Sequence, residues 1–508
     1  MDMNAAGYLE LIARYGLDVL SPPVTSHILE SGHRRSRVND GHREECYPRR
    51  DYPGEAWTDQ LAFALKHEGV NLEILAALFK VAPEGEFCRW VADAPTSRYT
   101  RVAWFLFEWL KGRELPLADL RQGNYVSVLD DEADFALPQK GPALNVRRQR
   151  VVNNLPGTRE YCPLVRRTEE LNRYESLNLA EQAIAQVKRF PAELVYRAAQ
   201  YLYIKETKSS YAIEHLTPDQ RRTARFVALL EQAGSLSCFS EADLVRLQNA
   251  MVDERYAAHT FRDFQNYVGQ SLGPARELVH YVPPKPEGLH SLMDGWMACC
   301  RNMQANGIHP VVTATVAGFG FVFLHPFEDG NGRLHRFLIH QALVAGKFSP
   351  SGAVFPVSAT MLKQKSRYDA ALEVYSKEIG RHVEYRLDDQ GKMTVVNETA
   401  AFYRYPDLTA QVEALFGFIE DTISTELVAE LEYLAVFENA RRLMLGVVDM
   451  PDRRLDLFLR TCLQGKGRLS RNKRALFKEL TDSECLQLQK IVQDAINDLD
   501  LESPKRGA

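Results

Sequence analysis

The chain has 508 residues, of which 45% are hydrophobic and 25% are charged. These values are ordinary for a globular protein, and a chain of this length is expected to form about two to four domains. Because the net charge is −5, composition excludes a polycation that binds phosphate backbones over its whole surface, although a local basic patch is compatible with it.

Three features favour a cytoplasmic protein without membrane contact. The eight cysteines include no CxxC pair and are scattered over a long chain, which argues against a zinc ribbon and favours reduced thiols. Residues 1–20 carry Glu10, Arg14 and Asp18 among apolar residues, a pattern that excludes a signal-peptide core. The longest apolar stretch, 311–324, is too short to span a membrane.

Residues 1–165 are predicted to form an N-terminal domain that is helical with basic loops. Apolar residues recur at helical spacing in 57–79 and 99–110. Basic residues cluster at 33–37 with 49–50, and at 147–150 with 166–167. The simplest interpretation is a solvated surface with carboxylate partners. The alternative is a docking surface for nucleic acid or an acidic partner, although aromatic residues for base stacking are sparse there.

Residues 166–380 are predicted to form a second, mostly helical domain. The stretch 261–284 interrupts it, because Gly269, Gly273 and Pro274 separate short β-prone runs, and it is predicted to be a hairpin. The expected helices lie at 177–186, 192–214, 217–232, 241–251, 288–304, 310–324 and 332–344. Residues 381–508 are predicted to form a third domain, in which a hairpin precedes further helices.

The segment from His325 to Arg336, HPFEDGNGRLHR, carries the chemical information. A buried apolar helix is predicted to end in this polar loop, where Gly330 and Gly332 allow backbone conformations with positive φ. The glycines open directly into the next helix, and the free backbone N–H groups at a helix N-terminus form an anion site. Arg333 and Arg336 are three residues apart, so they share a helix face and can reach along a polyphosphate.

Two further residues of the loop suggest a reaction. An acidic side chain beside a phosphate site, here Glu328 or Asp329, is a natural Mg²⁺ ligand, and His325 is a candidate general base near neutral pH. Together these groups indicate Mg²⁺-assisted phosphoryl or nucleotidyl transfer. A polar loop that merely caps a helix would explain any one of them, but not their combination within twelve residues.

The same segment matches in full the HxFx(D/E)GNGRxxR signature of the Fic (filamentation induced by cAMP) family, and about residues 170–380 resemble that family's core. The resemblance implies a mostly α, multi-domain helical protein with a central Fic-fold core and a small β-hairpin flap. It implies that His325 deprotonates a target hydroxyl as it attacks the α-phosphate of ATP. Asp329 would hold the Mg²⁺ that bridges the α- and β-phosphates.

The resemblance also assigns the remaining loop residues. The backbone of Gly330 and Gly332, with the side chain of Asn331, would form the anion hole. Arg333 would stabilise charge on the phosphates, and Arg336 would hold the γ-phosphate. AMP would pass to a Ser, Thr or Tyr hydroxyl of a target protein and pyrophosphate would leave, so that the expected activity is that of a protein adenylyltransferase.

A flap beside the active site binds the target as an added strand in this family. Here it would be the predicted hairpin, with Val279, His280 and Tyr281 near its edge. The expected partner is therefore a target protein that docks on the flap. The chain itself is a further candidate substrate, and a second copy is a candidate oligomer partner. An ordinary surface hairpin is the alternative.

Ser210 and Glu214 are four residues apart on one face of the helix predicted at about 200–215. They resemble the family's inhibitory pattern (S/T)xxxE(G/N), in which the glutamate pairs with the second arginine of the loop, here Arg336. Glu214 would thus occupy the group meant for the γ-phosphate. His215 departs from the pattern, which has Gly or Asn there. Some relatives use the same glutamate to remove AMP from the target, and the sequence leaves that reaction open.

Two alternatives to AMP transfer follow from the same residues. The loop builds a diphosphate site but does not read the base, so UMP, a phosphate or phosphocholine are other candidate groups for transfer. From a different class, the basic clusters suggest a nucleotide-sensing regulatory or DNA-binding protein whose binding would be sensitive to salt. Nucleic acid is nevertheless not the partner we expect.

Overall fold

The computed structural model describes residues 3–39, 41–138, 144–236, 239–273, 276–349 and 354–502. The chain forms two compact units. The first comprises Met1–Leu177, Lys208–Phe348 and Met361–Phe418, and the second comprises Asn178–Thr207, Ser349–Thr360 and Ile419–Ala508. The predicted domain boundaries near residues 165 and 380 both fall inside the first unit, so they stay a prediction.

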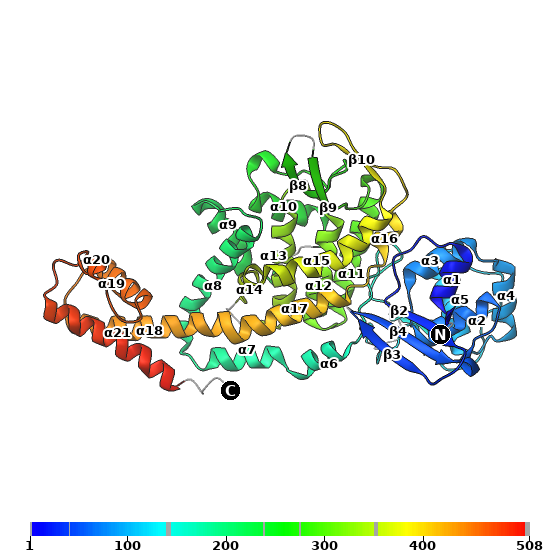
Figure 1. The fold of residues 1–508 in the computed structure, drawn as a ribbon, viewed down its shortest axis with the longest axis horizontal. Coiled ribbons are helices and arrows are strands. Elements are labelled where there is room, and N and C mark those ends of the chain that lie inside the picture. The colour runs from blue at the N-terminus through cyan, green and yellow to red at the C-terminus, as the bar shows by residue number, and fades with distance from the viewer. Residues whose placement is uncertain are drawn as a thin grey trace. The chain divides into compact units, whose positions relative to one another are not determined.

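The chain is mostly helical, as predicted, and its strands form small sheets (Figure 1). Helices that lie wholly in the first unit are α1 (Tyr8–Tyr15), α2 (Trp57–His67), α3 (Leu72–Val81), α4 (Glu84–Asp93), α5 (Arg98–Lys111), α6 (Glu169–Ser176), α9 (Gln220–Glu231), α10 (Glu241–Met251), α11 (Pro286–Ala305), α12 (Pro310–Leu324), α13 (Asn331–Ala345), α15 (Lys365–His382) and α16 (Ala400–Arg404).

The second unit is built from helices. Those wholly within it are α7 (Leu179–Lys188), α18 (Val428–Leu445), α19 (Asp452–Gln464), α20 (Arg471–Arg474) and α21 (Asp482–Glu502), together with a π-helical segment at Thr422–Leu427. Three helices contain residues of both units: α8 (Ala192–Ile213), α14 (Val357–Lys363) and α17 (Thr409–Asp421).

The N-terminal segment contains a four-stranded sheet that the sequence did not predict. Its strands are β1 (Met3–Ala6), β2 (Val24–Leu29), β3 (Arg35–Asn39) and β4 (His42–Pro48), in the order β1-β2-β4-β3. The basic stretch predicted to be a loop is largely β3, which pairs with β4 only and lies at the sheet edge. All five residues of β3 are exposed, so the strand lacks the alternation of apolar and polar residues by which a strand is detected.

Part of the basic clusters has acidic neighbours. Four of their arginines lie within 3.4 Å of a carboxylate oxygen: Arg34 with Glu45, Arg148 with Glu108, Arg166 with Asp407, and Arg167 with Glu175. These pairs agree with the simpler interpretation of the clusters, a surface whose charges are locally compensated.

Three smaller sheets complete the strand inventory. β5 (Val126–Ser127), β6 (Asn145–Val146) and β7 (Val151–Val152) form one of them, and β10 (Tyr385–Leu387) pairs antiparallel with β11 (Met393–Val395) as the predicted C-terminal hairpin. The predicted flap is the antiparallel pair β8 (Val268–Gly273) and β9 (Arg276–Tyr281).

The site is positioned by α12, which is apolar and almost entirely buried. Its N-terminus is capped by His309, whose Nδ1 accepts a hydrogen bond from the backbone of Val311 at 3.2 Å. α11 and α13 pack against α12, and all three helices belong to the first unit (Figure 1). Two glycines of α12 make this packing close. A Cβ at Gly318 would lie 2.6 Å from Ile339 on α13, and a Cβ at Gly320 would lie 2.5 Å from the hydroxyl of Tyr161.

Gly320→Ala is expected to lower the free energy of unfolding by about 1–3 kcal/mol, because the added methyl would overpack a core that cannot yield. Tyr161 and Trp296, which the methyl would meet, are both fully buried. The matched control is Gly380→Ala on α15, where a Cβ would have no neighbour within 4 Å and the alanine should stabilise the helix by about 0.5–1 kcal/mol. Thermal or denaturant unfolding of the two variants measures the difference, and equal midpoints would contradict this account of the packing.

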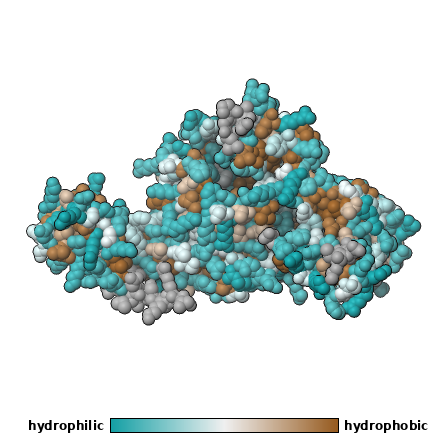
Figure 2. Space-filling model, viewed as in Figure 1, coloured by the Kyte–Doolittle hydropathy of each residue, from teal (hydrophilic) through white to brown (hydrophobic). Residues whose placement is uncertain are grey.

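In the part of the chain that the structure describes, no helix is long and apolar enough to cross a membrane. The seven cysteines among those residues form no disulfide. Figure 2 shows a mostly hydrophilic face on which apolar residues appear in separate patches.

Candidate active site

The loop between α12 and α13 is held in one shape by its own side chains. Gly330 has a φ of 88°, and a Cβ there would lie 2.7 Å from Val252, so only glycine fits. The Asn331 side chain accepts a hydrogen bond from the backbone N–H of Phe327 at 3.0 Å and donates one to its carbonyl at 2.7 Å. The resemblance assigns this side chain to the anion hole, which stays a prediction; in the structure both its polar groups brace the loop. Phe327 itself is buried against Phe261.

His325 follows the last residue of α12 and adopts a left-handed conformation, with a φ of 49°. Its Nδ1 lies 3.1 Å from the carbonyl oxygen of Val322. Because a carbonyl only accepts, Nδ1 carries the proton of the neutral ring, and Nε2 is left as the basic nitrogen. Loss of hydration lowers the pKa of His325 to about 4, an effect that the bond to Val322 only partly offsets.

The lowered pKa of His325 sets an expected pH dependence. A general base must be unprotonated. With a pKa of about 4, this ring stays neutral at pH values well below the ordinary pKa of histidine. Transfer by an uninhibited variant should therefore stay constant as the pH falls through about 6.5 and decline about tenfold per pH unit only below about pH 4–5. The dependence of kcat/KM for MgATP on pH measures this decline. A decline with its midpoint near the ordinary pKa of histidine would contradict the prediction.

The carboxylate of Glu214, one residue beyond the end of α8, contacts both arginines of the loop. Oε1 lies 2.6 Å from Nη2 of Arg336, and Oε2 lies 2.9 Å from Nε of Arg333. The two arginines are 2% and 1% exposed, whereas Glu214 is 25% exposed. A Cβ at Gly332 would collide with Glu214 Oε1, so the carboxylate lies directly against the first turn of α13. The sequence predicted only the contact with Arg336.

Ser210 completes the setting of Arg336. The guanidinium donates from Nε to the Ser210 hydroxyl at 2.8 Å and from Nη2 to the Ser210 carbonyl at 2.7 Å. Burial acts to lower the pKa of Arg336, but Glu214 and Tyr368 outweigh it, so the pKa lies above its ordinary value. The guanidinium is therefore charged, and Ser210 and Glu214 occupy its Nε and Nη2 groups.

His215, which departs from the inhibitory pattern, adopts a left-handed backbone conformation. This residue has a φ of 57° and is exposed. Left-handed backbone is the conformation that glycine and asparagine adopt most readily, which is the choice of the family pattern. Here a histidine takes up the same conformation, so the turn after Glu214 keeps its shape.

Asp329 is partly exposed, and its Oδ1 accepts hydrogen bonds from the backbone of Gly330 at 2.6 Å and from Arg333. The described residues contain no cluster of three His, Cys, Asp or Glu side chains able to hold a metal ion. A single carboxylate fits Mg²⁺ that arrives with a nucleotide, because this ion is commonly held by one or two carboxylates together with substrate phosphates.

The flap residues divide into two kinds. Val279 is half-buried and His280 is exposed, whereas Tyr281 is buried and its hydroxyl donates to the Phe323 carbonyl at 2.5 Å. The Tyr281 side chain therefore anchors β9 to α12. The pairing of β8 with β9 is irregular next to His280, and the hairpin has no third strand among the described residues. The hairpin side chains from 272 to 276 lie outside the description.

Two residues beside the loop were not predicted from the sequence. Gln248 on α10 is buried and donates to the carbonyls of Asp329 and Tyr256, at 3.1 and 2.9 Å. Arg262 is buried and donates to the carbonyl of His325 at 2.9 Å. Neither residue belongs to a sequence motif with the loop. Both bind backbone carbonyls, and because every residue has a carbonyl, the sequence does not show which ones a side chain contacts.

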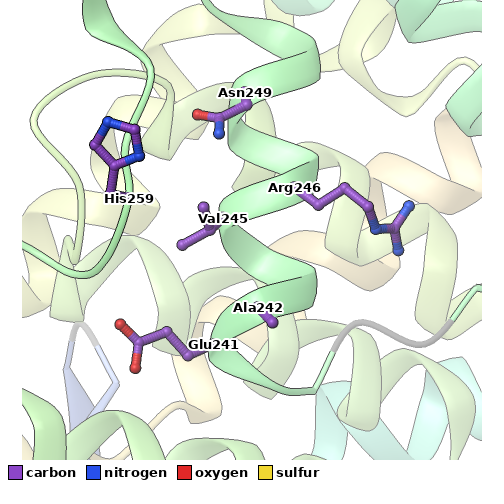
Figure 3. Close-up of a pocket in the computed structure, with 6 residues that line it drawn as sticks. All are labelled: Glu241, Ala242, Val245, Arg246, Asn249 and His259. Atoms are coloured by element: carbon purple, nitrogen blue, oxygen red, sulfur yellow. The ribbon is translucent and has the colours of Figure 1, made fainter.

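A shallow recess lies along α10 and the loop that carries His259 (Figure 3). Its polar side chains are mostly engaged within the protein: Glu241 accepts from the backbone of Phe261 at 3.1 Å, and Asn249 donates to Ala258 at 3.0 Å. Arg246 pairs with Asp243 at 3.3 Å. The recess holds none of the loop residues and is separate from the candidate active site.

Comparisons with known proteins agree with this geometry. The model of the Fic/DOC family matches residues 238–343. Protein adenylyltransferase Fic of Drosophila grimshawi is 37% identical over 90 residues, which is 18% of this chain and 17% of that protein. Its counterpart in Aedes aegypti is 37% identical over 90 residues, 18% of this chain and 16% of that protein.

A longer match covers more of the core. Protein adenylyltransferase Fic of Culex quinquefasciatus is 26% identical over 206 residues, which is 35% of this chain and 39% of that protein. The chain thus spans less than half the length of these curated relatives. The family match covers α10 to α13 and includes the flap and the whole loop. Over residues 238–343, the chain therefore matches the Fic/DOC family.

Proposed function

We propose that this chain is a protein adenylyltransferase that moves AMP from MgATP to a Ser, Thr or Tyr hydroxyl of a target protein. One observation carries the proposal: within the family-matched segment, a single short loop joins a neutral histidine at the end of α12 to two buried, charged arginines in the first turns of α13. A basic nitrogen next to a cationic anion site is what nucleotidyl transfer to a hydroxyl requires. The relatives named protein adenylyltransferase Fic support ATP as the donor.

The transfer itself is a displacement at the α-phosphorus. Nε2 of His325 takes the proton of the target hydroxyl, whose oxygen forms a bond to the α-phosphorus. The bond from that phosphorus to the oxygen bridging to the β-phosphate breaks, and pyrophosphate carries away the electron pair. Arg333 and Arg336 would hold the phosphates in line and stabilise their charge. Asp329 would hold Mg²⁺, which when bound neutralises charge on the α- and β-phosphates.

Glu214 acts as a brake in this proposal. Its carboxylate occupies both guanidinium groups that the phosphates of ATP need. A nucleotide must displace it or bind with its terminal phosphate elsewhere. Breaking one side of a buried ion pair is costly unless another anion replaces it, so the target or a partner that moves the end of α8 would release the activity.

The target is proposed to dock on the free edge of the flap, as an added strand beside β9. An unpaired strand edge offers backbone N–H and C=O groups at regular spacing. Val279 and His280, which are not fully buried, are the side chains placed to contact it. The chain itself is a second proposed substrate, and we place the reaction in the cytoplasm.

The choice of transferred group is tested with Glu214→Gly protein and lysate proteins as acceptors. Separate reactions receive ATP labelled at the α-phosphate, ATP labelled at the γ-phosphate and UTP labelled at the α-phosphate. Label from α-labelled ATP alone is the expected result. Label from γ-labelled ATP would indicate phosphorylation, and label from UTP would indicate uridylylation; either result in place of the first would overturn the proposal. The double variant Glu214→Gly/His325→Ala controls for label that binds without transfer.

A further inference from the structure

Arg262 is a buried cation whose guanidinium bonds, among the described residues, to backbone carbonyls alone. It is 4% exposed, and the described residues place no carboxylate oxygen within 4 Å of its guanidinium. Nε donates to the His325 carbonyl at 2.9 Å, Nη1 to Phe264 at 2.8 Å and Nη2 to Pro284 at 2.6 Å. Burial of a charge without a counter-ion is expensive and lowers the pKa of Arg262 to about 10. The rigid fork of donors of an arginine can hold several carbonyls in one fixed geometry.

The three carbonyls belong to segments that the chemistry has to bring together. Phe264 lies just before β8 and Pro284 just after β9, so they mark the two ends of the flap. His325 is the proposed base, and its carbonyl lies at the C-terminal end of α12, where a cation is favoured by the helix dipole. The backbone N–H of Arg262 adds a fourth bond, to the Pro326 carbonyl at 2.9 Å.

The phosphate half of the loop has different anchors. Asn331 holds the Phe327 backbone, and Gln248 holds the Asp329 carbonyl. Arg262 contacts neither of these groups. It therefore connects the flap with the base. Asn266, two residues before β8, adds a bond from its side chain to the Phe327 carbonyl at 3.1 Å, and Asn331 and Gln248 are further anchors of the anion site.

We propose that Arg262 is a positioning residue that fixes the flap relative to His325, and with it the target hydroxyl relative to the base. This inference rests on the proposed function. A guanidinium spans three carbonyls in a fixed plane, whereas the ammonium of lysine is a point charge that cannot reproduce this geometry. Misplacement of a reacting group by about 1 Å can cost a factor of about 100 in rate.

The test uses full-length Glu214→Gly protein as the parent, with lysate proteins as acceptors and α-labelled MgATP as the varied substrate. Arg262→Lys should lower the apparent kcat about 10- to 100-fold, with KM for MgATP within about twofold of the parent, because the phosphate anchors are intact. The matched control is Arg101→Lys. Arg101 is also 4% exposed and donates to a backbone carbonyl, that of Asn124 at 2.7 Å, far from the loop in sequence. It should change neither constant.

Each outcome decides the inference. An unchanged kcat would overturn it, as would an equal rise in KM, since that would mean that Arg262 merely supports the loop as a whole. If Arg262→Lys does not fold, Tyr281→Phe replaces it: loss of the hydroxyl bond to Phe323 should produce the same split between kcat and KM at a smaller size, and no split would overturn the inference. A parent that transfers no label would instead show that the proposed function is wrong, and the inference would fall with it.

Discussion

Removal of the His325 imidazole is expected to slow AMP transfer by a factor of about 10² to 10⁴, the usual contribution of a general base. The substitution is His325→Ala in the Glu214→Gly background, and the rate of label incorporation from α-labelled ATP measures it. The physical reason is that Nε2 is the unprotonated nitrogen of a ring whose Nδ1 is tied to the Val322 carbonyl. No other described histidine lies in the loop with such an arrangement, since His335 is buried within α13.

Binding of MgATP should survive the same substitution, because the anion site consists of other residues. Calorimetry of MgATP with the two proteins separates this result from a general loss of structure. His259→Ala is the matched control: it removes an exposed histidine that lines the recess along α10, and it should leave the rate unchanged. Transfer that persists in His325→Ala would exclude this residue as the base.

Glu214→Gly is expected to raise the rate of AMP transfer about 10- to 100-fold at a fixed concentration of MgATP. Each tenfold step corresponds to about 1.4 kcal/mol of competition between the carboxylate and the phosphates. That is less than the cost of about 3–5 kcal/mol for breaking one side of a fully buried ion pair, in keeping with the partial exposure of Glu214. Glycine costs little helix stability here, because α8 ends at Ile213.

Two further substitutions identify the cause of any activation. Glu214→Gln keeps the size of the side chain and removes its charge, so it should activate nearly as much as glycine. Glu214→Asp keeps the charge but is shorter by one methylene, so it should retain part of the inhibition. The opposite order, with Asp activated and Gln inhibited, would mean that the shape of the side chain and not its charge blocks the site.

The loop and its brake were predictable because their residues are close in sequence or at a fixed helical spacing. Gly330 has a positive φ, a local backbone conformation that a glycine between a helix end and a helix start predicts. Ser210 and Glu214 are four residues apart and lie on one face at the end of α8. The second ion pair, from Glu214 to Arg333, was not predicted. This ion pair depends on how closely the end of α8 packs against α13, and the sequence does not show the packing distance between segments that are far apart in the chain.

Other features were out of reach of the sequence for the same physical reason. Arg262 acts through backbone carbonyls, which every residue has, so nothing in the sequence distinguishes its partners. β3 was missed because all its residues face solvent, and a strand is detected by its buried face. The glycines of α12 serve close helix packing, and only their neighbours in space show this.

The central claim is that Glu214 and the γ-phosphate of ATP compete for the guanidinium group of Arg336. The most direct measurement is calorimetric titration of wild-type and Glu214→Gly protein with MgATP and with MgADP, which lacks the γ-phosphate. The account predicts that the substitution improves the affinity for ATP at least about tenfold more than the affinity for ADP, in line with the contacts to Arg336. If the ratio of the two dissociation constants is the same in both proteins, Glu214 does not occupy the place of the γ-phosphate, and the account of the brake is wrong.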